Sequence, residues 1–191
     1  MVEKEKGTSM NNTQIIMFDG ICLEATDQAA MVFPYDTYTY KTFPDNYCGA
    51  GNGLGERLVP DYIFGSTKMF AWCGLDISIK ISMACFLHDK EFEYAGPSVT
   101  EFVQSNDLLH KNIESIIKAK ARNEYVLARA MYRPVTYMNA VSILGRYVFW
   151  SLKAAQGYKI PDMADQYVTN DFVERASRRI KAGALSAGRG L

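Results

Sequence analysis

Residues 76–113 read DISIKISMACFLHDKEFEYAGPSVTEFVQSNDLLHKNI, with two periodic apolar segments on either side of Gly96-Pro97. In the first segment, residues recur at the i, i+4, i+7, i+8 and i+11 spacing of one helix face: Ile77, Ile81, Ala84, Cys85 and His88. We predict a helix that begins at the N-cap residue Asp76. It should end before Gly96, because a proline disfavours helical geometry in the residue that precedes it.

A second helix is predicted after the Gly-Pro pair. Ser98 and Glu101 have the spacing of a capping box, in which the serine hydroxyl and the glutamate satisfy free amides of the first turn. The apolar pattern then continues to about Lys120. The sequence therefore predicts two consecutive helices that fold back on each other as an antiparallel pair.

Such a pair brings a histidine level with a carboxylate. His88 lies 8 residues before Gly96 and Asp107 lies 9 residues after Ser98, which is ~12 Å and ~13–14 Å along the two helices. A carboxylate opposite an imidazole can fix its tautomer and stabilise the imidazolium that forms when histidine acts as a base. Asn106 takes this position instead if the register differs by one residue.

The segment 47–55, Tyr-Cys-Gly-Ala-Gly-Asn-Gly-Leu-Gly, is the other unusual feature. It holds four glycines in its last seven residues, so its backbone can make tight turns that other residues disfavour. Hard cations such as calcium take six to eight oxygen ligands, many of them backbone carbonyls. A curled loop of this kind, together with the carboxylate of Asp89, can supply such oxygens.

Two stretches taken together, Tyr47–Asn52 followed by Ala84–Asp89, resemble the phospholipase A2 family. Its secreted members combine a Tyr-Cys-Gly-x-Gly-Gly calcium loop with a Cys-Cys-x-x-His-Asp helix. The phospholipase domain of parvoviral minor capsid proteins is similar too: its Gly-rich loop resembles Gly49–Leu54, its His-Asp-Lys-x-Tyr helix resembles residues 88–92, and its Ala-Asp pair on the return helix resembles Asn106-Asp107. The resemblance covers roughly residues 46–113.

The resemblance implies a calcium-dependent esterase acting on the sn-2 ester of glycerophospholipids. It implies that Ca²⁺ is held by the carbonyls of Tyr47, Gly49 and Gly51 and by the carboxylate of Asp89. His88 would accept a proton from the attacking water.

The same resemblance implies supporting roles. Asp107 would orient His88, and the N–H of Gly49 would help to stabilise the oxyanion. It also brings Cys48 and Cys85 close enough to form a disulfide, whereas two buried free thiols are the alternative in a reducing compartment. Phe92 stands where the family has a tyrosine. This departure keeps open a non-catalytic structural or assembly protein on a degenerate phospholipase scaffold.

The rest of the chain predicts a mainly α fold with a small N-terminal β element. Residues 14–43 are rich in β-branched and aromatic residues and are predicted to form strands. Two further helices are expected, one after Pro134 and ending near Gly157, the other over 162–181. The stripe expected to face the core in the former comprises Tyr137, Val141, Leu144, Val148 and Leu152. We expect tails at 1–13 and 182–191 around one domain, 14–181, with its β element at 14–45, catalytic core at 46–113 and additional helices at 114–181.

Charge and hydropathy constrain the function classes. The formal net charge is zero, but residues 1–109 carry 7 Lys/Arg and 15 Asp/Glu, whereas residues 110–191 carry 14 and 6. Either the two halves neutralise each other within one fold, or the basic half faces a phospholipid membrane surface; a nucleic-acid-binding module is a weaker alternative. Residues 1–13 have no apolar run of a cleavable signal, and Arg146 interrupts the longest apolar stretch. With the parvovirus-like loop, this favours a virion-associated protein or an exported effector, assembling with other proteins of that kind.

Overall fold

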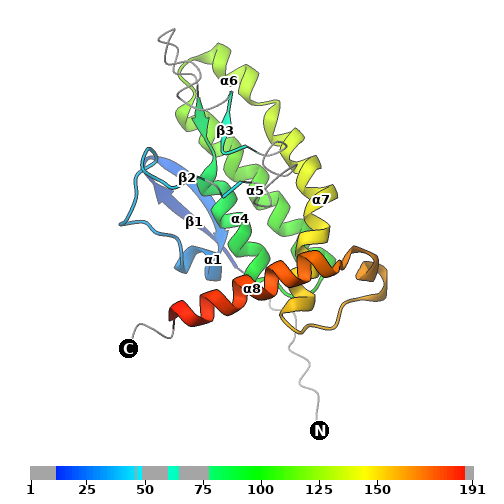
Figure 1. Ribbon diagram of the computed structural model, residues 1–191. Coiled ribbons are helices and arrows are strands. Elements are labelled where there is room, and N and C mark those ends of the chain that lie inside the picture. Colours follow the sequence, from blue (N-terminus) through cyan, green and yellow to red (C-terminus); the bar gives the residue numbers. More distant parts are fainter. Residues whose placement is uncertain (1–11, 46, 49–59, 65–77, 188–191) are drawn as a thin grey trace.

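The computed structural model describes residues 12–45, 47–48, 60–64 and 78–187. It is mainly helical with small antiparallel sheets, as the sequence predicts (Figure 1). The strands are β1 (Thr13–Phe18), β2 (Ile21–Thr26), β3 (Tyr62–Ile63) and β4 (Ile79–Lys80). The helices are α1 (Asp27–Met31), α4 (Ser82–Tyr94), α5 (Val99–Lys120), α6 (Glu124–Ala130), α7 (Arg133–Ala155) and α8 (Asn170–Ala187), with a 3₁₀ turn at Asp162–Tyr167.

The N-terminal hairpin forms where the first strand segment was predicted. β1 and β2 pair antiparallel from Thr13 opposite Thr26 to Phe18 opposite Ile21. The two-residue turn Asp19-Gly20 has positive φ at both positions, which aspartate and glycine tolerate and which matches the strand twist. Alternate side chains, among them Ile16 and Leu23, are buried in the main core.

Beyond Thr26 the strand prediction is wrong, because residues 27–43 form α1 and a series of turns. The Thr26 hydroxyl accepts a hydrogen bond from Ala29 N and caps α1. Phe33 and Phe43 then turn inward and stack at 5.8 Å between ring centroids. The aromatic residues that suggested a strand are therefore used to fill the core from an irregular segment.

The two central helices agree with the prediction except at the start of α4. That helix begins at Ser82, because the residues just before it pair as β4 with β3, while Asp76 and Ile77 lie outside the described residues. α4 ends at Tyr94, ahead of the Gly-Pro pair, and Ser98 Oγ accepts a hydrogen bond from Glu101 N at 3.2 Å. α4 and α5 lie side by side (Figure 1).

α7 packs along this pair with a different face from the one predicted. Tyr137 is buried as expected, but the side chain of Leu144 is 43 % exposed. Phe149 and Trp150 are buried instead, in a second core cluster. The ring of Phe149 contacts Phe92 of α4 and Phe102 of α5. Gly145 is buried against the ring of Phe92, where a Cβ would meet the ring at an ordinary van der Waals distance of 3.6 Å.

The last predicted helix, 162–181, is divided into two elements. A 3₁₀ turn covers Asp162–Tyr167, and α8 follows from Asn170. α8 crosses over the lower ends of α7 and α4 as they appear in Figure 1. None of the helices in the described part of the chain is long and apolar enough to cross a membrane.

Candidate functional site

His88 lies on the face of α4 that packs against α5, and only 8 % of the residue is exposed. Its Nε2 lies 2.9 Å from Oδ1 of Asn106 on α5. Because an amide oxygen only accepts hydrogen bonds, Nε2 carries the proton and donates it to Asn106. The unprotonated Nδ1 is therefore the basic atom of this ring.

The structure places Asn106, rather than Asp107, against His88. Asp107 is exposed on α5, so the prediction that its carboxylate faces the imidazole is wrong by one residue. The reason is helix geometry, since neighbouring residues differ in direction by ~100°. The buried stripe of α5 runs through Phe102 and Leu109, and Asn106 lies between them at helical spacing. That stripe is the sequence signal that selects Asn106.

The electrostatics of His88 favour its neutral form. Burial lowers the pKa of His88 to about 4, although the hydrogen bond to Asn106 acts in the opposite direction. The ring of Phe92 lies over the imidazole at 4.2 Å between centroids, and packs in turn on Phe102 and Phe149. At neutral pH the histidine is thus an uncharged base beside an apolar wall. Neither Asn106 nor Phe92 offers a charge to an imidazolium.

Asp89 follows His88 on α4 and points elsewhere. Its side chain is 41 % exposed and lies 3.8 Å from Nη2 of Arg179 on α8. Desolvation by the surrounding protein raises the pKa of Asp89 to about 6, while Arg179 and Lys90 oppose that shift. Above that pH the carboxylate is charged and open to solvent on one side, as a cation ligand must be.

The start of the glycine-rich loop is fastened to the same helix. Cys48 and Cys85 form a disulfide, as the family resemblance implies. Asp61 adds a second link, because its Oδ1 accepts hydrogen bonds from Cys48 N at 3.3 Å and from Ser82 Oγ at 2.8 Å. The aromatic ring of Tyr47 packs on Phe86 at 5.1 Å. The loop therefore enters beside α4, one helical turn before Asp89.

The predicted calcium ligands are only partly described. Asp89 and Tyr47 belong to the described residues, whereas Gly49 and Gly51 lie outside them, as does any oxyanion contact of the Gly49 N–H. Among the described residues no three His, Cys, Asp or Glu gather as a metal site. A carboxylate and a backbone carbonyl are hard oxygen donors, and both thiols near them are consumed in the disulfide. This donor chemistry fits calcium better than zinc.

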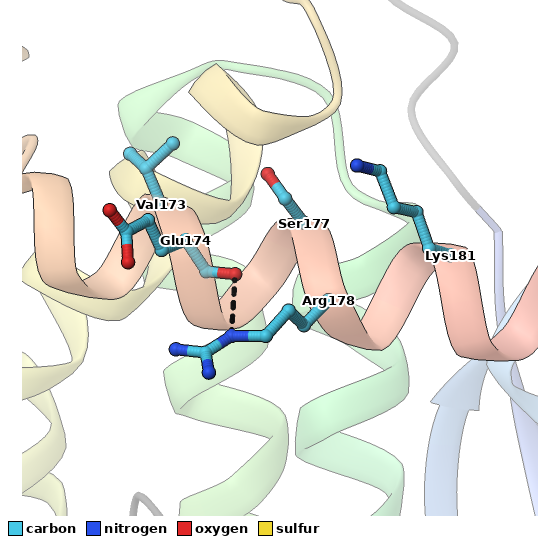
Figure 2. Close-up of a pocket in the computed structure, with 5 residues that line it drawn as sticks. All are labelled: Val173, Glu174, Ser177, Arg178 and Lys181. Carbon is cyan, nitrogen blue, oxygen red and sulfur yellow. Dashed lines mark hydrogen bonds between the residues drawn. The ribbon is translucent and has the colours of Figure 1, made fainter.

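Asn106, which the sequence offers as the alternative to Asp107, contacts His88; the contact of Arg179 with Asp89 was not predicted. Arg179 belongs to the basic half of the sequence, residues 110–191, but nothing local indicates which carboxylate it would approach. Figure 2 shows an open surface depression along α8, lined by Val173, Glu174, Ser177, Arg178 and Lys181. All five residues come from one helix and none belongs to the His88–Asp89 site, so the depression is no part of it.

No protein-family model matches this chain, and comparisons with curated proteins and with solved structures give no match.

Proposed function

We propose that this protein is a calcium-dependent esterase that hydrolyses the sn-2 ester of glycerophospholipids. The observation that carries the proposal is the arrangement on α4: a neutral His88 whose Nε2–H is held by Asn106, next to Asp89 and to a loop tethered through Cys48–Cys85. The family resemblance of the loop and the His-Asp pair supplies the substrate class.

In this proposal Nδ1 of His88 accepts a proton from water as the water oxygen attacks the ester carbonyl carbon. The imidazolium then returns that proton to the departing lysophospholipid oxygen as the ester C–O bond breaks. Asn106 keeps the ring in the tautomer that leaves Nδ1 free. Asp89 and the carbonyls of Tyr47, Gly49 and Gly51 would hold Ca²⁺, which when bound polarises the carbonyl and stabilises the oxyanion.

Fatty-acid release from phospholipid vesicles tests this function. We expect release that requires calcium, stops with a chelator, and falls by about 10²–10⁴ in His88→Ala, the usual contribution of a general base. Asp107→Asn is the matched control, because Asp107 is exposed and has no part in the site. Absence of release from every lipid tested, with a folded wild-type protein, would refute the proposal.

A second candidate is a non-catalytic structural or assembly protein on the same scaffold. It is favoured by the amide at position 106 and the phenyl ring at position 92, since neither can support an imidazolium. The two candidates differ in one measurement. The assembly protein would bind calcium or its partners unchanged in His88→Ala and would release no fatty acid.

A further inference from the structure

α8 carries more basic side chains than its neighbours neutralise. Its residues 170–181 include four Lys or Arg and two acidic residues. Arg175 pairs with Asp171 at 2.7 Å, and Nε of Arg178 bonds only to the backbone oxygen of Glu174 within the helix. These basic side chains are exposed (Figure 2 shows two of them), so the helix presents positive charge to its surroundings.

The apolar side of α8 is poorly covered. Phe172, Val173 and Ala176 are only half-buried where the helix crosses the ends of α7 and α4, and Ile180 is 40 % exposed. A helix with one apolar side and a basic polar side is the kind that lies in the interface of a bilayer. Anionic phospholipid headgroups complement its charge.

One basic side chain of α8 contacts the candidate site. Nη2 of Arg179 lies 3.8 Å from Oδ2 of Asp89 while the arginine side chain stays 81 % exposed. The contact therefore places a positive charge beside the carboxylate that the proposed function assigns to calcium. A cation approaching Asp89 meets repulsion from this guanidinium, and the contact has to be released or weakened as the cation binds.

We infer that α8 is a displaceable latch over Asp89, and that an anionic phospholipid surface is the partner that removes it. The assignment of Asp89 as the calcium ligand rests on the proposed function. On such a surface the arginines of α8 exchange their protein contacts for headgroup phosphates, and the half-buried apolar side moves into the interface. Calcium affinity at Asp89 then rises when the protein meets the membrane on which it acts.

The relative strengths of the contacts support this exchange. An exposed ion pair changes an equilibrium by about 1.4- to 5-fold, whereas each cation near an anionic bilayer changes it by about fivefold. The four basic residues of α8 together outweigh the single contact with Asp89. The contact between Arg179 and Asp89 is thus weak enough to break at an anionic bilayer. Without lipid, its effect on calcium affinity is still large enough to measure.

Two matched variants test the inference, Arg179→Gln and Arg178→Gln. Each removes one positive charge from the same exposed helix, but only the former removes the contact with Asp89. In calcium titrations without lipid, Arg179→Gln should bind calcium about two- to fivefold more tightly. Arg178→Gln should match the wild type. Equal calcium affinities in all three proteins would overturn the latch.

Vesicle sedimentation without calcium gives a second, independent measurement. Arg178→Gln should weaken binding to phosphatidylserine vesicles by about fivefold. Arg179→Gln should weaken vesicle binding by less than this, because α8 of the variant can bind the vesicle without breaking a contact with Asp89. Identical losses in the two variants, or equal binding to phosphatidylcholine and phosphatidylserine vesicles, would overturn the inference. If the wild type binds no calcium, the proposed function fails, while the difference between the two variants on vesicles still decides whether α8 is a latch.

Discussion

Asn106→Asp is the change that bears most directly on the site, because it places a carboxylate where the structure has an amide. The amide Oδ1 accepts the Nε2–H of His88 at 2.9 Å, and aspartate can keep this hydrogen bond with almost the same shape. The variant differs from the wild type mainly in charge. It therefore measures how far a negative charge beside the ring raises the pKa of His88.

The size of the effect follows from the distance. Two opposite charges about 4 Å apart at an effective dielectric constant of ~20 attract by ~4 kcal/mol, which corresponds to ~3 pKa units. Burial holds the pKa of His88 at about 4 in the wild type. We expect the pKa of His88 to rise to ~7 in Asn106→Asp. A stronger base that also has its cation stabilised should hydrolyse substrate at least ~10-fold faster, which is less than the full 10²–10⁴ that general-base catalysis supplies.

The assay is a pH titration of the His88 ring protons by NMR, with fatty-acid release measured on the same protein. His110 supplies the second histidine signal, which should be the same in Asn106→Asp as in the wild type. Asp107→Asn makes the reverse exchange at the neighbouring exposed position and should leave the pKa of His88 unchanged. A folded Asn106→Asp protein in which His88 still titrates near 4 would show that Asn106 does not bond to Nε2 and would refute the site as described here.

Four further results are expected. Cys48→Ser with Cys85→Ser should cost about 3–4 kcal/mol in the free energy of unfolding in denaturant titrations, because the disulfide closes a loop of 37 residues; a loss below ~1 kcal/mol would contradict the tether. The folded-state pKa of His88 lies below its unfolded value, so the free energy of unfolding should fall by ~3 kcal/mol as the pH falls from 6.5 to 4, and His88→Asn should flatten that fall. Phe92→Tyr should destabilise the fold by ~1–3 kcal/mol without raising activity, since the ring is enclosed by apolar neighbours; faster hydrolysis would show that the hydroxyl finds a partner. Calcium affinity should weaken as the pH falls through about 6, where Asp89 takes up a proton, and a flat calorimetric profile from pH 5 to 7 would argue against Asp89 as a ligand.

The parts of the fold that could be predicted are those in which local chemistry and packing agree. The Asp-Gly turn, the Ser98–Glu101 cap and the end of α4 before Gly96-Pro97 are all set by backbone preferences of the residues themselves. The segment 29–43 shows the opposite case. Its aromatic residues favour a strand in isolation, but the core accepts Phe33 and Phe43 as stacked rings from a series of turns.

The candidate site also has a part that the sequence could predict and a part that depends on tertiary structure. The Cys48–Cys85 bond was implied by the family resemblance, whereas the partner of His88 depends on how α5 is rotated about its axis. The number of residues from the Gly-Pro pair fixes a position along the helix but not the rotation of the helix, so it does not separate Asn106 from Asp107. The buried stripe of α5 does fix that rotation and selects Asn106. The contact of Arg179 with Asp89 joins positions 90 residues apart, and only the tertiary structure brings them together.

Desolvation shifts the pKa values of His88 and Asp89 in opposite directions. At neutral pH both residues are nevertheless in the protonation state that the proposed chemistry needs before substrate binds. The pKa of His88 falls to about 4 and that of Asp89 rises to about 6, so at neutral pH the imidazole is uncharged and the carboxylate is charged. A base must also hold a proton during turnover, and here the apolar Phe92 and the amide of Asn106 give the imidazolium no counter-charge. In the proposed function, calcium binding and proton acceptance therefore depend on different residues. The charged Asp89 serves the first, and the amide at position 106 limits the second. Under the proposed function we therefore expect lipid hydrolysis to be slow even when calcium is bound, because nothing at position 106 or 92 stabilises the imidazolium.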